Sequence, residues 1–145
     1  MDWKKEAMDK LRCYEARKNA IVSIPQEIKR LEASFAGIHS ASADSTPVTG
    51  GGSTREDMLL SNIAHREELA LALRQAKAVV ACVDEGLSVL DSEERLVLDR
   101  FYIHPAHGNV ERLCSELGIE QSSVYRRRDR ALRHFTIALY GAVEI

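Results

Sequence analysis

Residues 109 to 135 read NVERLCSELGIEQSSVYRRRDRALRHF, and they predict two helices that meet at a glycine. The first helix is expected to run from Asn109, whose side-chain oxygen can accept from the unpaired amides of the first turn, to Leu117. Gly118 follows, and glycine adopts the left-handed conformation just past a helix end without a Cβ penalty. Glu120 then stands at the N-cap position of a second helix. This order is typical of a helix-turn-helix.

The second of these helices combines an apolar face with a concentration of arginine. Residues 121 to 135 carry five arginines against one acid, whereas residues 91 to 120 carry three arginines against seven acids. Arginine-rich helices are often only solvated surfaces, but here a preceding helix, a glycine turn and an apolar face favour phosphate binding. The apolar positions are Val124, Ala131, Leu132 and Phe135.

Composition places the chain among folded, water-soluble proteins. Its 145 residues suit one ordinary domain or two small ones, with 45% apolar and 29% charged residues. No signal-peptide pattern follows Met1, and no apolar run approaches the roughly 20 residues that span a bilayer, so no membrane contact and a cytoplasmic location in a bacterial host are expected. Reduced, half-buried thiols are expected at Cys13, Cys82 and Cys114.

An apolar stripe with a heptad-like period runs through the N-terminal helical segment, residues 1–38. Such a stripe must pack against another helix. One set of its positions recurs every seven residues, and the others lie three or four residues away: Ala7, Tyr14, Ile21, Ile28 and Phe35, with Trp3, Leu11, Ile24, Leu31 and Ile38.

Pro25 interrupts this stripe, because proline lacks an amide hydrogen and clashes with the preceding turn. Ser23 and Gln26 have the spacing of a capping box. We therefore predict that one helix ends near residues 20–22 and that a second starts at Ile24. A kink in one continuous helix is the close alternative.

Residues 39–54, HSASADSTPVTGGGST, predict a flexible linker, because serine, threonine, glycine and proline cannot supply a core. The three consecutive glycines lack the GKS or GKT sequence of a phosphate loop, so the linker interpretation is preferred.

The segment 55–89 predicts a long helix that pairs with the N-terminal segment. It is expected from Ser53, with Glu56 as capping-box partner, to about Ser88. The simplest packing is an antiparallel hairpin, and a homodimer through the N-terminal helices is the competing option. The seam positions are Leu69, Leu73, Ala76, Val80, Val83, Leu87 and Leu90, while Leu59, Leu60, Ile63, Leu71 and Val79 lie outside it.

Residues 90–145 form the expected DNA-binding domain. Asp91 and Glu94 make a capping box that opens a bracing helix, whose apolar positions are Leu96, Val97, Phe101 and Tyr102. His104, His107 and Cys114 do not predict a zinc site, because a closed site needs four ligands at tight spacing. After Phe135, the run TIALYGAVEI is expected to pack back on the domain or on a partner subunit.

The run from Leu90 to Phe135, with LDSEERLVLDRFY, VERLCSELGI and SSVYRRRDRAL, resembles the promoter-reading C-terminal domain of sigma-70 family factors (region 4). Nearly the whole chain resembles the ArpU and RinA type of phage late-gene regulators from Gram-positive hosts. The resulting fold class is all-α, with a long coiled-coil-like hairpin before a region 4-like helix-turn-helix. Sigma domains usually carry an aliphatic residue where Arg127 stands. Either Arg127 extends along the core into solvent, or the second helix is seated differently.

Docking geometry assigns roles to the polar residues. A recognition helix enters the major groove with its N-terminal residues toward base edges, and the resemblance implies readout from the same positions. The residues assigned to bases are Gln121, Ser122, Tyr125 and Arg126. Those assigned to phosphates are Arg112, Ser123, Arg128, Arg130 and Arg133.

The expected function is sequence-specific binding of double-stranded DNA. The resemblance implies an activator of phage late genes for packaging and lysis, with host RNA polymerase as a further partner. A small terminase subunit, which also joins a helix-turn-helix to an oligomerisation segment, is the alternative. A dedicated sigma factor is a weaker option, because no core-polymerase or promoter-melting region is recognisable. No catalytic, metal or nucleotide motif is present, so a protein without catalysis or cofactors is expected.

Overall fold

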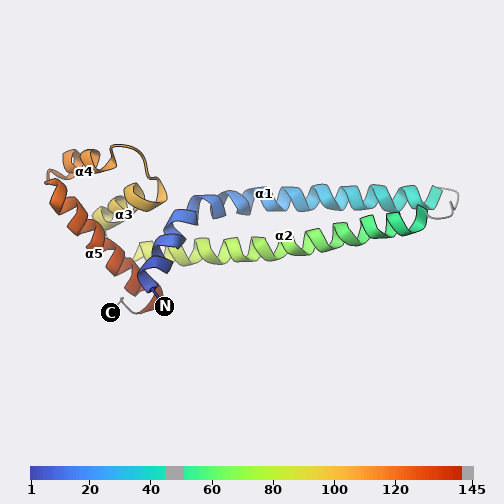
Figure 1. Ribbon diagram of the computed structural model, residues 1–145, viewed down its shortest axis with the longest axis horizontal. Helices are drawn as coiled ribbons and strands as arrows, with labels where there is room; N and C mark the ends of the chain where they lie inside the picture. The colour runs from blue at the N-terminus through green and yellow to red at the C-terminus, as the bar shows by residue number, and fades with distance from the viewer. Residues whose placement is uncertain (45–50, 142–145) are drawn as a thin grey trace. The chain divides into compact units, whose positions relative to one another are not determined.

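A computed structural model describes residues 1–44 and 51–141, and every regular element in those ranges is a helix (Figure 1). The expected all-α class is therefore confirmed. None of the described helices is long and apolar enough to cross a lipid bilayer. The elements are α1 (Trp3–Asp44), α2 (Gly51–Ser88), α3 (Ser92–Leu98), the π-helix η1 (Asp99–Ile103), α4 (Asn109–Leu117) and α5 (Gln121–Tyr140).

The chain divides into two compact units. Unit 1 comprises Met1–Arg17 together with Ala78–Ile145, and unit 2 comprises Lys18–Lys77. Within unit 2, the remaining parts of α1 and α2 lie side by side (Figure 1). The DNA-binding domain expected at 90–145 thus shares its compact unit with the first turns of the chain.

Helix α1 is continuous across Pro25, so the predicted helix end near residues 20–22 is wrong and the continuous alternative holds. Proline removes one backbone hydrogen bond and costs a helix interior about 3 kcal/mol. The apolar stripe continues on both sides of Pro25, and all its positions are buried or half-buried. Because this packing favours one helix over the whole stripe, it offsets the local cost.

The helices also extend into both ends of the predicted linker. Residues 39–44 belong to α1 and residues 51–54 to α2, so the boundaries 39–54 are wrong in the described part of the chain. Residues 45–50 lie outside the described residues. Ser53 cannot be an N-cap, because α2 begins before it at Gly51. Once a helix is nucleated, each further residue adds a hydrogen bond, and even weak helix formers extend it.

A polar cluster joins the helices of unit 2. Asn62, which is 8% exposed, donates from Nδ2 to the carbonyl oxygen of Leu31 at 2.9 Å. Arg66 donates to Asn62 Oδ1 at 2.8 Å and lies 5.0 Å from the ring centroid of Phe35. A buried amide is tolerated when it is hydrogen-bonded, so this cluster favours one register of α1 on α2.

Two apolar cores hold unit 1 together. The first gathers side chains from α1, α2, α3, η1 and α5, among them Leu11, Val83, Leu98, Leu132 and Phe135. The second is smaller and joins α3, α4 and α5 through Val97, Leu113 and Val124. The four apolar positions predicted for the second helix of the pair are all buried. Both cores contact α5, which fixes the position of this helix.

Candidate nucleic-acid interface

The turn between α4 and α5 forms around Gly118. This glycine has φ 66° and ψ 38°, the left-handed conformation expected from the sequence, and its amide donates to the carbonyl oxygen of Cys114 at 2.9 Å. Glu120 follows with an extended backbone at the N-cap of α5, but its side chain makes no capping hydrogen bond. The amide groups in the first turn of α5 therefore receive no hydrogen bond acceptor from the side chain of the N-cap residue.

Asn109 does not cap α4 as predicted. The N-cap is Gly108, with φ 79°, and Asn109 is the first residue of the helix. Its buried side chain donates from Nδ2 to the carbonyl oxygen of Arg100 at 2.5 Å. In the π-helical pattern this carbonyl would accept from the residue five positions on, which is Pro105 and has no amide hydrogen. Asn109 supplies the missing donor and joins η1 to α4.

An exposed polar stripe follows the outer surface of α5. Ser122, Arg126, Arg130 and Arg133 are exposed, and their spacing of three to four residues places them on one face of the helix. Arg126 Nη2 donates to Ser123 Oγ at 3.1 Å, and Ser123 is half-buried. Two residues assigned to bases, Ser122 and Arg126, are therefore followed on the same helical face by two assigned to phosphates, Arg130 and Arg133.

Gln121 and Tyr125 lie beside a shallow hollow rather than on this stripe. The hollow holds about 320 Å³ and is bordered by η1, the following loop and the start of α4. Tyr125 packs its ring 6.1 Å from that of Phe101, and the guanidinium of Arg128 lies 5.0 Å from Tyr125 and 5.2 Å from Phe101. The sequence predicts no functional role for Phe101, because its contacts on α5, Tyr125 and Arg128, lie more than twenty residues away.

Two of the five arginines on α5 form ion pairs within the protein. Arg127 forms an ion pair with Glu93 of α3. Arg127 is thus a partly exposed cation with a carboxylate partner. Arg128 pairs with the adjacent Asp129 at 3.0 Å and stacks on the two aromatic rings. Among the residues assigned to DNA contacts, Arg126, Arg130 and Arg133 on α5 and Arg112 on α4 form no ion pair with the described residues.

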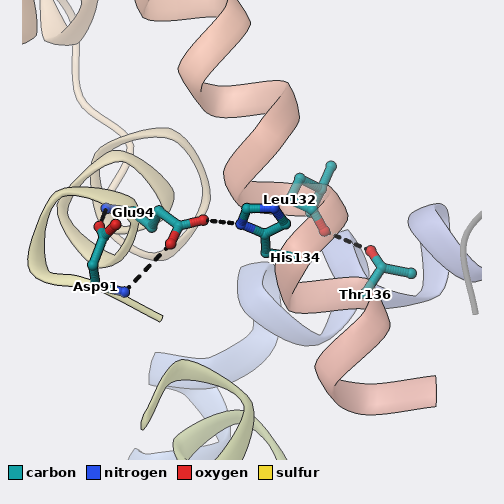
Figure 2. A network of polar contacts seen from close by, with 5 residues as sticks. All are labelled: Asp91, Glu94, Leu132, His134 and Thr136. Atoms are coloured by element: carbon teal, nitrogen blue, oxygen red, sulfur yellow. Dashed lines mark hydrogen bonds and ion pairs between the residues drawn. The ribbon is translucent and has the colours of Figure 1, made fainter. Parts of the chain in front are cut away.

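A polar network joins α3 to α5 (Figure 2). The predicted capping box is present: Glu94 N–H donates to Asp91 Oδ1 at 2.7 Å, and Glu94 Oε1 accepts from Asp91 N–H at 3.4 Å. The other oxygen of the same carboxylate lies 2.5 Å from His134 Nδ1 on α5. The hydrogen bond from the Glu94 amide lowers the pKa of Asp91, and the nearby charge of Arg130 acts in the same direction. The carboxylate of Glu94 thus completes the capping box of α3 and also contacts α5 through His134.

His104 is the C-cap residue of the π-helix, and its ring contacts two carboxylates. Its Nδ1 lies 2.8 Å from Asp99 Oδ1, and its Nε2 lies 3.1 Å from Glu15 Oε1 on α1. His107 is exposed beside the hollow, and Cys114 is half-buried against the second core. Within residues 1–44 and 51–141, no group of three or more His, Cys, Asp and Glu side chains is arranged to hold a metal ion.

We expect this histidine to stabilise unit 1 at low pH. The hydrogen bond to Asp99 raises the pKa of His104 above 6.5, so its contribution is present below that value and is lost as pH rises through the raised pKa. His104→Gln should therefore lower the melting temperature more at about pH 6 than at about pH 8.5. An equal decrease at both pH values would show that the charge of His104 is not involved.

No protein family matches this chain, and comparison with curated proteins and with solved structures yields no match either. The resemblance to sigma region 4 and to late-gene regulators therefore depends only on the motifs quoted above.

Proposed function

We propose that this chain is a sequence-specific DNA-binding transcriptional regulator whose α4 and α5 form a helix-turn-helix. The observation that carries the proposal is the two-sided character of α5. One side is buried in two apolar cores, and the other presents Ser122, Arg126, Arg130 and Arg133 to solvent. A rigid helix with an outward row of arginine donors is suited to a DNA groove.

In this docking, α5 lies in the major groove with its first turns toward the bases. Gln121, Ser122, Tyr125 and Arg126 face base edges, where glutamine pairs with adenine and arginine with guanine. Arg112, Arg130 and Arg133 contact phosphates, which position the helix without reading sequence. Ser123 and Arg128 contribute less directly, because one accepts from Arg126 and the other is held in the aromatic stack.

The biological role that we propose follows from the resemblance. The protein acts without catalysis in the cytoplasm of a bacterial host, at promoters of phage late genes, and recruits host RNA polymerase there. The region 4-like part supplies promoter recognition. The remainder of α1 and α2, which we propose to form a hairpin, supplies contacts with a second protein.

A second copy of the chain is the partner that we propose for unit 2. Its helices leave large apolar side chains exposed, namely Val22 at 65%, Met58 at 51%, Leu60 at 64% and Leu71 at 49%. Exposed apolar side chains that gather into one patch mark interaction sites, and we propose that these four contribute to such a patch. Light scattering distinguishes the two candidate functions: a dimer supports the regulator, and a ring of many subunits supports the terminase alternative.

Selection of DNA from a random duplex pool tests the proposed function directly. The purified protein should enrich a defined sequence and should bind it about 10³-fold or more tighter than random duplex at physiological salt. The enriched site should then occur upstream of packaging and lysis genes. Selection that yields no common sequence would contradict the proposal.

A further inference from the structure

An open cleft in unit 1 gathers positive charge beside the proposed interface. It lies between the first turns of α1, the π-helix and the middle of α5, and holds about 520 Å³. Its lining contains four cations and two carboxylates: Lys4, Lys5, Arg12, Arg128, Asp2 and Asp129. No role is predicted from the sequence for the three cations of α1.

The two carboxylates of this cleft are already engaged. Asp2 Oδ1 accepts from the backbone amide of Lys5 at 2.9 Å, which caps the start of α1. Asp129 pairs with Arg128 at 3.0 Å. In the described part of the chain, neither lysine forms an ion pair, so neither charge has a direct partner; Lys5 is exposed and Lys4 is half-buried.

The two arginines of the cleft are held by aromatic rings of the π-helix. Arg12 lies 5.6 Å from the centroid of Tyr102, and Arg128 lies 5.2 Å from that of the adjacent Phe101. The ion pair of Arg12 with Asp9 measures 4.0 Å between two side chains more than half exposed, and such pairs are weak in water. Stacked guanidiniums lose little freedom when their edges bind an anion.

The cleft and the hollow beside Gln121 share one lining residue. Phe101 lines both, and Arg128 stacks on Phe101 and on Tyr125. A DNA duplex that contacts the start of α5 can therefore also reach the first turns of α1, which line the cleft. Lysine suits phosphate at such a flank, because it is a mobile point charge and reads no base.

We propose that Lys4, Lys5 and Arg12 form a second phosphate-binding surface, which holds the backbone of the same DNA duplex that α5 reads. This inference rests on the proposed function. It assigns the N-terminal turns of α1 to the DNA-binding surface, whereas α4 and α5 alone would form the interface of an isolated helix-turn-helix.

The test is the salt dependence of DNA binding by the full chain with Lys4→Gln and Lys5→Gln combined. Each lost phosphate contact reduces the slope of log K against log salt by about 0.9, so the slope should fall by roughly 2. Affinity should decrease by the same factor on selected and on random duplex. Lys4→Arg with Lys5→Arg should retain the wild-type slope, because it keeps both charges.

The matched control removes two exposed lysines of unit 2, with Lys29→Gln and Lys77→Gln, and should leave the slope unchanged. If wild type binds DNA and Arg130→Ala flattens the slope while the Lys4 and Lys5 variant does not, the second surface is overturned and the proposed function stands. If wild type binds no duplex at low salt, the proposed function fails, and this inference fails with it.

Discussion

Arg126→Ala weakens binding to the selected DNA by about 1 to 3 kcal/mol and relaxes the preference at one base pair. The guanidinium is exposed at the second turn of α5, and its only described hydrogen bond is to Ser123 on the same helix. Removing it leaves the apolar cores untouched. The loss should therefore appear in specificity and not in stability, which competition between selected and single-base-altered duplexes measures.

Arg130→Ala is the matched comparison on the same face of α5. If Arg130 contacts phosphate, its loss should weaken all sequences alike and reduce the salt slope by about 1. The two variants remove the same charge from one helix, four residues apart. The assignment of roles would be wrong if both variants bound every duplex as wild type does, or if both changed only the salt slope.

Gly86→Val should lower the free energy of unfolding by about 1 to 3 kcal/mol through overpacking. A Cβ atom at residue 86 of α2 would lie 2.8 Å from Phe135 Cε1 and 2.9 Å from Leu139 Cδ2 on α5. The Phe135 ring is fully buried, and close-packed protein interiors leave a buried ring little room to move. Denaturant unfolding followed by circular dichroism measures the change.

Gly37→Ala provides the control, because it also replaces a helical glycine but meets no atom within 4 Å. Here the higher helix propensity of alanine should raise the free energy of unfolding by about 0.4 to 1 kcal/mol. Opposite signs for the two glycines would confirm that α5 packs closely on α2. Stabilisation by both changes would contradict that packing.

The parts of the fold that local chemistry determines were predictable from the sequence. The capping box of Asp91 and Glu94 and the left-handed Gly118 each involve residues at most four positions apart. The buried face of α5 followed from its period. The helix break predicted at Pro25 is wrong for the opposite reason, because packing along the whole apolar stripe outweighs the local cost of a proline.

The contacts that shape the candidate interface were not predictable in the same way. Arg127 meets Glu93 across 34 positions, and His134 meets Glu94 across 40. Neither pairing leaves a periodic pattern in the sequence. Pro105 does give a local indication, because a missing amide five residues after Arg100 requires another donor, and Asn109 supplies it.

Binding to duplexes that contain 7-deazaguanine tests the central claim most directly. This base lacks the N7 acceptor, which guanine presents only in the major groove. If α5 lies in that groove, one substituted guanine within the selected site should weaken wild-type binding by about 1 to 3 kcal/mol and should leave Arg126→Ala unaffected. Unchanged wild-type binding at every substituted guanine would contradict major-groove readout by Arg126.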